Sequence, residues 1–258
     1  MGELLGIMGA IGSGKTTFAR YLTDTTPNHA YYETWRVVAE IATAFNQALK
    51  AELAYETTNN SLELVNQVLI WLPEAISEHL HHDVVWNQLA IAKHDTLLRP
   101  SLYEKLFVYL KIVEKKPKLL DTSITPEVKE TFRPLLQWLG GYLVVKISKT
   151  IWYDELLRRI ELRDPTTSLV VVSGVRYTSD AEALRNRSGH IVAIERPGLA
   201  KTKPDVTEAE RATIKPEVTI ANDGTLEQLR TLAETFANDL MAGDLKKSYA
   251  AATKTITP

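Results

Sequence analysis

Near the start of the chain, glycine, lysine and hydroxyl side chains follow one another in a spacing that can bind phosphate. The segment GAIGSGKT, residues 9–16, matches the pattern G-x-x-x-x-G-K-[ST] at every position. In that pattern glycines turn backbone N–H groups toward phosphate oxygens, the lysine reaches the β- and γ-phosphates, and the hydroxyl holds Mg²⁺. We therefore expect Lys15 to be catalytic and Thr16 to bind the metal. The residues expected to bind a nucleoside triphosphate are Gly9, Ile11, Gly12, Ser13, Gly14, Lys15, Thr16 and Thr17.

The elements that must hold such a loop, a strand before it and a helix after it, are both indicated. Leu4–Met8 is a short apolar run typical of a buried parallel strand, and Thr16–Thr23 has helical apolar spacing. Further strands are expected at 30–35, 168–175, 190–197 and 217–223. Further helices are expected at 37–53, 62–80, 89–113 (interrupted at Pro100), 132–139, 151–162, 180–186 and 226–240, with a helix start at Thr125-Pro126 and a break at Gly140-Gly141.

The order of these elements predicts an α/β fold with a mostly parallel central sheet covered on both faces. We expect residues 1–243 to form one domain. Within it, a helical region at about 37–162 should lie over the carboxyl ends of the strands, where ligands bind in such sheets. Residues 244–258 are expected to be a polar, mobile tail.

Composition excludes several classes of protein. The 258 residues carry a formal net charge of −2, so no overall basic field attracts nucleic acid or an anionic membrane. There is no cysteine, which excludes disulfides, zinc–thiolate sites and thiol catalysis. No apolar run approaches the ~18 residues of a membrane span, and the start lacks the basic segment of a signal peptide. We expect a cytoplasmic protein with no nucleic-acid or membrane partner, and a homodimer remains open.

Arg176 is the first cation to consider beyond the loop, because phosphoryl transfer depends on neutralising charge. It follows the apolar run 168–175, and strand ends face the ligand crevice in parallel sheets. We expect its guanidinium to clamp an acceptor phosphate; the alternative is a structural ion pair with Glu182 or another acid.

Three segments resemble the deoxynucleoside monophosphate kinase family of bacteriophages. They are VVVSGVRYTSDAEALRNRSGHIVAIERPG at 170–198, residues 132–160 from FRPLLQWLGG to IWYDELLRRI, and PEVTIANDGTLEQLRTLAE at 216–234. The last also resembles dephospho-coenzyme-A and adenylate kinases. The resemblance implies a three-layer P-loop kinase fold with an inserted helical subdomain. It also implies transfer of the γ-phosphate of ATP to a (deoxy)nucleoside monophosphate, with Mg²⁺.

The resemblance assigns roles to further residues. Arg133 is expected near the phosphates as a catalytic cation, and Arg36 near the acceptor. Asn222 and Gly224, in an expected tight turn whose glycine allows positive φ, should contact the adenine of ATP.

Two positions depart from the family pattern. Gly174 replaces an aspartate that would support Mg²⁺. After Gly140-Gly141, Lys146 and Lys149 stand where the family offers an arginine.

Glu33 supports a rival function. The run YYETW at 31–35 also resembles deoxynucleoside kinases, in which an acid here removes the proton from the sugar hydroxyl. Three hypotheses therefore remain open: a nucleoside monophosphate kinase, a deoxynucleoside kinase that uses Glu33 as its base, and a P-loop nucleotide-binding protein with little or no kinase activity. The loss of an acid at Gly174 supports the third.

Overall fold

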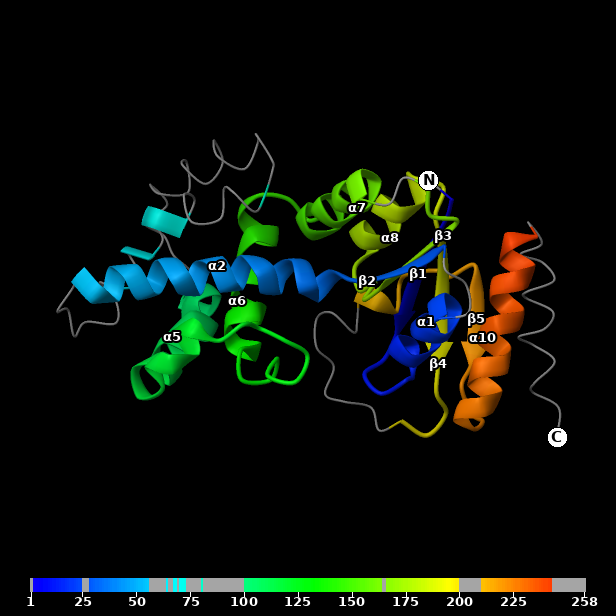
Figure 1. Cartoon of the computed structure of the whole chain (residues 1–258), viewed down its shortest axis with the longest axis horizontal. Helices are drawn as coiled ribbons and strands as arrows, with labels where there is room; N and C mark the ends of the chain where they lie inside the picture. Colours follow the sequence, from blue (N-terminus) through cyan, green and yellow to red (C-terminus); the bar gives the residue numbers. More distant parts are fainter. Residues whose placement is uncertain are drawn as a thin grey trace. The chain divides into compact units, whose positions relative to one another are not determined.

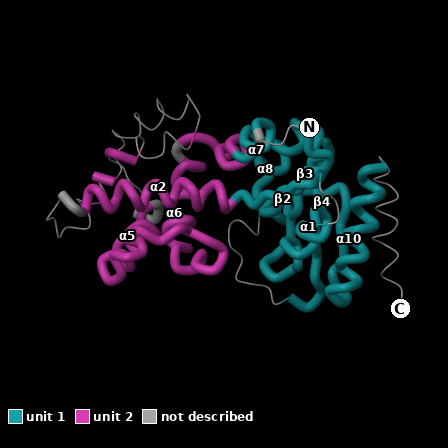
Figure 2. Tube along the Cα trace, in the orientation of Figure 1, with its two compact units in different colours: residues 1–34, 156–258 teal, residues 35–155 magenta. Residues whose placement is uncertain are grey.

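The computed structural model of the chain describes residues 2–24, 28–55, 100–163, 166–199 and 210–242, with isolated positions between 64 and 80. It divides the chain into two compact units: unit 1, residues 1–34 with 156–258, and unit 2, residues 35–155 (Figure 2). The helix expected at 62–80 lies largely outside the described residues. Residues 89–99 and the tail 244–258 lie wholly outside them.

Unit 1 contains a five-stranded sheet in the order β2-β3-β1-β4-β5, and every neighbouring pair is parallel. The prediction of a mostly parallel sheet is confirmed. Because all strands run the same way, their carboxyl ends share one edge of the sheet. The strands are β1 (Glu3–Gly9), β2 (His29–Glu33), β3 (Leu169–Ser173), β4 (His190–Glu195) and β5 (Val218–Ala221).

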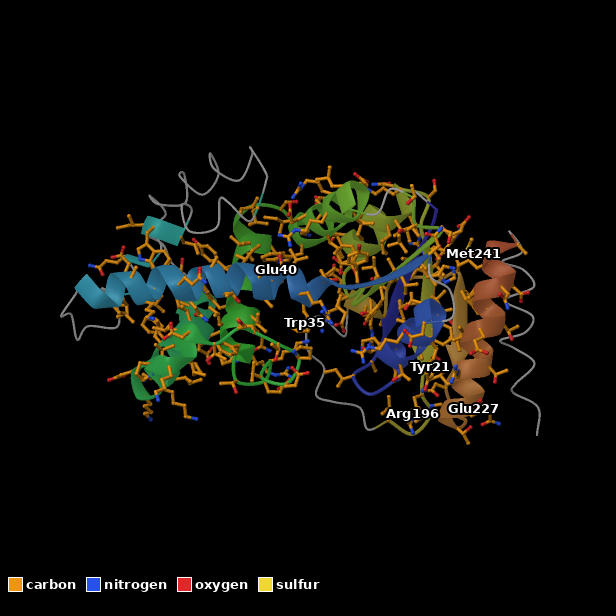
Figure 3. All side chains as sticks on the ribbon, viewed as in Figure 1. Tyr21, Trp35, Glu40, Arg196, Glu227 and Met241 are labelled. Atoms are coloured by element: carbon orange, nitrogen blue, oxygen red, sulfur yellow. The ribbon has the colours of Figure 1, made fainter. Side chains whose placement is uncertain are left out.

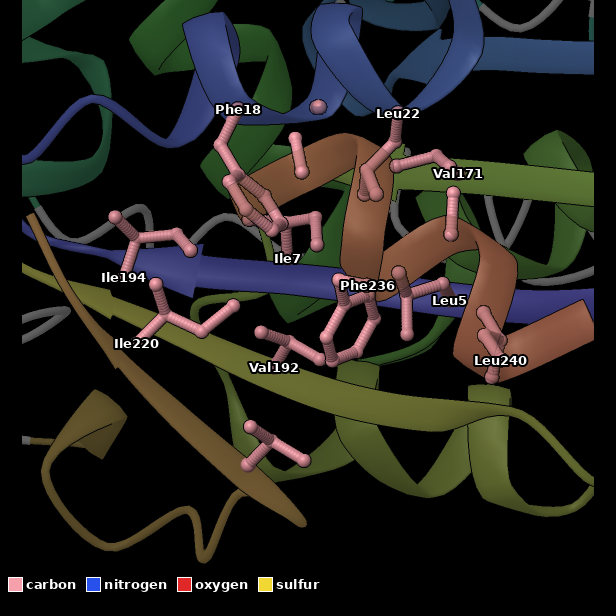
Figure 4. Packing of buried hydrophobic residues seen from close by; sticks show 14 of the residues in the cluster. Leu5, Ile7, Phe18, Leu22, Val171, Val192, Ile194, Ile220, Phe236 and Leu240 are labelled. Carbon is pink, nitrogen blue, oxygen red and sulfur yellow. The ribbon is translucent and has the colours of Figure 1, made fainter. Parts of the chain in front are cut away.

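Helices cover both faces of this sheet (Figure 1). On one face, α1 (Lys15–Asp24) and α10 (Leu226–Met241) share a core with the strands, in which Phe18 meets Phe236 edge-on at 6.1 Å (Figure 4). On the other, α8 (Thr178–Arg185) comes so close that a Cβ at Gly6 would approach Leu184 Cδ1 to 2.5 Å. Burying each large apolar side chain contributes ~2 kcal/mol. The three-layer prediction is confirmed.

Unit 2 is built from helices packed around aromatic side chains. Trp138 stacks on Tyr142 with ring centroids 5.3 Å apart, and Phe45 lies 5.5 Å from Trp138. Helix α7 begins in this unit and ends in unit 1. The elements are α2 (Thr34–Tyr55), α5 (Pro100–Lys115), the 3-10 helix η1 (Pro117–Asp121), α6 (Arg133–Lys146) and α7 (Ile151–Arg163).

Two local predictions in unit 2 are wrong. Gly140-Gly141 does not end a helix, since α6 continues through the pair. The Gly140 carbonyl accepts a 2.8 Å hydrogen bond from the Trp152 indole. Tertiary packing here overrides the weak helix propensity of glycine. The helix expected at Thr125-Pro126 does not form either; turns run to Phe132, whose ring is fully buried.

The expected second strand ends earlier than its sequence suggests. Strand β2 stops at Glu33, and α2 starts directly at Thr34. In the part of the chain that the structure describes, no helix has both the length and the apolar character needed to cross a bilayer.

Candidate functional site

The phosphate loop connects the end of β1 to the start of α1, as predicted. Gly12 and Gly14 have φ of +82° and +91°, a left-handed conformation that glycine adopts without strain. The amide of Phe18 then donates to the Gly14 carbonyl at 2.9 Å, which starts the helical ladder. Lys15 Nζ donates to the Ala10 carbonyl at 2.9 Å, so the ammonium folds back over the loop. The glycine-rich backbone of the loop and the Lys15 ammonium thus lie together, at the end of β1.

The side chain of Asn222, which directly follows β5, makes a hydrogen bond to this loop. Its Nδ2 donates to the Ser13 carbonyl at 2.8 Å, and both residues are buried. A Cβ at Gly14 would overlap the same Nδ2, so glycine is required there for a second reason. The side chain of Asn222 therefore positions the phosphate loop. The sequence predicted a contact between this residue and adenine, but not this role.

Gly224 lies in the segment after β5 but does not have positive φ, so that part of its prediction is wrong. A Cβ at Gly224 would overlap Gln228 Oε1, which accepts the amide of Thr225 at 2.7 Å. Thr225 Oγ1 accepts the amide of Gln228 in return. Gly224 thus leaves room for the capping box that starts α10.

Hydroxyl groups and one carboxylate gather at the ends of β2 and β3. Tyr31 Oη lies 2.8 Å from Ser173 Oγ, and Ser173 is 5% exposed. The Glu33 carboxylate and the Thr16 hydroxyl lie close enough to the Tyr31 hydroxyl to influence its pKa. Burial, above all, raises the pKa of Tyr31 to about 12, the Ser173 contact opposes this, and the Glu33 carboxylate adds to it. Tyr31 therefore stays protonated at neutral pH and can donate.

The loop after β3 carries Arg176 and is fixed by a buried carboxylate. Asp180 Oδ2 accepts the amides of Arg176 and Tyr177, each at 2.9 Å. Burial raises the pKa of Asp180 to about 6, although these hydrogen bonds and the nearby Arg176 oppose the shift. The side chain of Arg176 is exposed. Asp180 fixes the backbone from which that guanidinium projects.

In unit 2, the first turns of α2 border a cavity of about 460 Å³. Lys129 Nζ lies 4.0 Å above the Trp35 ring, and Arg36 Cζ lies 5.9 Å from it. Figure 3 labels Trp35 and Glu40, both of which line the cavity. The cavity combines the aromatic ring of Trp35 with the cation Arg36, the acid Glu40 and polar groups. Its lining residues are Trp35, Arg36, Ala39, Glu40, Thr43, Ala44, Gln47, Ser123, Ile124, Thr125 and Pro126.

A model of the deoxynucleotide monophosphate kinase family matches residues 3–232. The chain belongs to that family. It is also 29% identical over 79 residues to a protein of Acanthamoeba polyphaga mimivirus whose name assigns it provisionally to the deoxynucleotide monophosphate kinases. That match covers 30% of this chain and spans 38% of the relative's own length. The resemblance inferred from the sequence is confirmed, and the sheet with its phosphate loop is the fold of a P-loop kinase.

Most residues predicted for a kinase of this family lie at one edge of the sheet in unit 1. Lys15 and Thr16 follow β1, Glu33 ends β2, Arg176 follows β3 and Asn222 follows β5. Their individual roles stay predictions.

Two other residues for which a functional role was predicted lie in unit 2. Arg36 is on α2, and Arg133 starts α6, where its guanidinium forms two hydrogen bonds of 2.7 and 2.6 Å with the Glu130 carboxylate. That pair raises the pKa of Arg133 and lowers the pKa of Glu130. A guanidinium held in this way must exchange a carboxylate for a phosphate before it can serve as a catalytic cation.

Sequence reasoning missed Tyr31, Ser173, Asp180 and Lys129. Only Asp180 has a local signal, since an acid three residues into a helix can accept the amide of the capping residue. A second cavity, of about 830 Å³, lies at the amino ends of β1 and β4. It belongs to the opposite edge of the sheet from the phosphate loop, and its arginines, Arg185 and Arg187, pair with Glu217 and Glu161.

Proposed function

We propose that this protein transfers the γ-phosphoryl group of ATP to a (deoxy)nucleoside monophosphate in the cytoplasm, with Mg²⁺, and forms the diphosphate. The observation that carries the proposal is the complete phosphate loop, with Lys15 folded over it and Arg176 projecting from the same edge of the sheet. Bound Mg²⁺ supplies neutralisation of charge on the phosphates, and the Thr16 hydroxyl is the group that would bind it.

In this reaction a phosphate oxygen of the acceptor bonds to the γ-phosphorus, and the bond from that phosphorus to the β–γ bridging oxygen breaks. The acceptor oxygen is already ionised at neutral pH, so no base is needed. Lys15 and the loop amides neutralise charge on the transferred and leaving groups, while Arg176 orients the acceptor phosphate. These residues provide positioning and charge, which is most of what phosphoryl transfer requires.

For unit 2 we propose acceptor contacts along the cavity beside Trp35 and Arg36. A volume of about 460 Å³ lies within the ~300–1,000 Å³ of small-molecule sites. The indole offers an aromatic face for a base, and Arg36 offers a cation for a phosphate. Replacing Trp35 by leucine should raise KM for the acceptor and leave the Kd for ATP unchanged.

The deciding experiment measures ADP release with ATP, Mg²⁺ and a panel of nucleosides and nucleoside monophosphates. Turnover with at least one monophosphate, abolished in Lys15→Ala and retained in Lys105→Ala on the exposed face of α5, supports the proposal. Turnover with nucleosides alone, lost in Glu33→Gln, would instead identify a deoxynucleoside kinase. ATP binding without turnover on any acceptor would identify a nucleotide-binding protein that has lost the reaction.

A further inference from the structure

The end of β3 lacks the carboxylate that the family resemblance implies, and its backbone explains why. Gly174 has φ of +101°, and its amide donates to the Ile7 carbonyl at 3.1 Å. A side chain in that conformation is strained, and a Cβ would lie 3.4 Å from Thr34 Oγ1. With glycine at position 174, an acid that supports Mg²⁺ has to come from elsewhere at this edge of the sheet.

Few acids at this edge of the sheet are suitable. Within the described residues, no three or more His, Asp or Glu side chains form a group that could hold a metal by themselves. This is ordinary for Mg²⁺, which uses one or two protein groups together with substrate phosphates and keeps several waters. Asp180 is buried and accepts two backbone amides, so it is committed elsewhere. Glu195 ends β4, which pairs directly with β1, so it is the competing acid at this edge of the sheet.

Glu33 has the required position. It ends β2 and pairs in register with Ser173, the last residue of β3, which in turn pairs with Ile7 of β1. The Glu33 carboxylate raises the pKa of the Tyr31 hydroxyl and the Thr16 hydroxyl lowers it, so both groups lie near that hydroxyl. That hydroxyl is held by Ser173 Oγ at 2.8 Å, so Glu33 and Thr16 meet at the end of β2 and β3.

We propose that Glu33 is the acid of the Mg²⁺ site: its carboxylate accepts hydrogen bonds from the water shell of the ion that Thr16 holds, in place of an aspartate at position 174. Tyr31 is a positioning residue, since its hydroxyl lies 2.8 Å from Ser173 Oγ and its pKa responds to both Thr16 and Glu33. This inference rests on the proposed binding of Mg²⁺ and ATP, but not on the identity of the acceptor.

The test is equilibrium binding of ATP, measured by calorimetry over a range of Mg²⁺ concentrations and in EDTA, for wild type and Glu33→Gln. Loss of a group that holds a metal's ligands typically costs ~10–100-fold in metal affinity. We expect Glu33→Gln to need ~10–100-fold more Mg²⁺ for half-maximal ATP binding. In EDTA its affinity for ATP should be undiminished or higher, because a negative charge near the phosphates is removed.

Matched variants separate the metal role from general damage. Glu195→Gln removes an acid from the end of another strand of the same sheet and should leave the Mg²⁺ dependence unchanged. Tyr31→Phe keeps the carboxylate but removes the hydroxyl near it and Thr16, so a smaller shift in the same direction is expected. If Glu33→Gln does not fold, Glu33→Asp should fold and give an intermediate shift, because it keeps the charge on a shorter side chain.

An unchanged Mg²⁺ dependence in a folded Glu33 variant would overturn the proposal, as would equal weakening with and without Mg²⁺. The result is independent of turnover. A wild type that binds Mg²⁺ and ATP but phosphorylates no acceptor would refute the proposed function and leave the Glu33 assignment standing. Turnover on a monophosphate with normal Mg²⁺ dependence in Glu33→Gln would do the reverse.

Discussion

Replacing Asn222 by alanine should weaken ATP binding although this side chain need not touch ATP. Its Nδ2 donates to the Ser13 carbonyl at 2.8 Å inside the protein, where Ser13 is 0% exposed. Removing the donor leaves a buried carbonyl unpaired, which costs ~1–3 kcal/mol. If that cost falls on the phosphate loop, which ATP must then reorder, the Kd for ATP rises ~5- to 150-fold.

The assay is calorimetric titration of ATP with saturating Mg²⁺, combined with thermal unfolding of the nucleotide-free protein. If the lost hydrogen bond instead destabilises the folded state of unit 1 as a whole, the melting temperature falls by ~2–4 °C per kcal/mol for a protein of this size. Asn222→Asp should be worse than Asn222→Ala. It places an acceptor oxygen against the Ser13 carbonyl and adds a negative charge beside the phosphate loop.

The matched control is Asn238→Ala, which removes an exposed asparagine from α10 and should change neither quantity. Wild-type ATP affinity together with a wild-type melting temperature in Asn222→Ala would refute this reasoning. An Asn222→Asp variant that binds ATP as well as wild type would also refute it. That result would mean that the side chain only fills space and that its N–H donor is not needed.

Three further predictions concern other parts of the chain. Arg176→Ala should lower kcat/KM for the acceptor by ~10²-fold or more in a steady-state assay, and Arg176→Lys should restore only part, because an ammonium lacks the planar fork. In the folded protein the pKa of Asp180 is raised to about 6, so folding becomes less favourable as pH rises from about 4 to 6, by ~3 kcal/mol at most. Asp180→Asn should remove this pH dependence from the melting temperature. Gly141→Ala should raise the free energy of unfolding by ~0.5–1 kcal/mol in denaturant titrations, because an added Cβ meets nothing within 4 Å in the middle of α6.

The central strands and the phosphate loop could be predicted because their signals are local. Strand β3, for example, is an uninterrupted run of buried valines and leucine, and the loop motif occupies consecutive positions. Local signals failed where packing decides the outcome. The pair Gly140-Gly141 resembles a helix break in sequence, yet Trp152 and the buried residues on either side hold it in a helix.

The contacts that complete the site join residues far apart in the chain. The hydrogen bond from Asn222 to Ser13 spans 209 positions, and that between Tyr31 and Ser173 spans 142. No periodicity or spacing in a single sequence indicates such pairs. They follow from the strand order, which places the ends of β2, β3 and β1 side by side and the end of β5 next to that of β4.

That same strand order bears on whether Gly174 marks a lost reaction. Strand β2 is separated from β1 by β3 alone, so the end of β2 lies ~10 Å from the end of β1. A glutamate side chain extends over a large part of such a gap, and its carboxylate would then be placed to accept hydrogen bonds from waters of a bound Mg²⁺. Moving the acid from the end of β3 to the end of β2 therefore changes which strand supplies it but keeps it within reach of Thr16. The cation two residues beyond Gly174, Arg176, keeps its place because Asp180 fixes its amide. A glycine at position 174 is thus compatible with an active kinase, provided that Glu33 carries the charge.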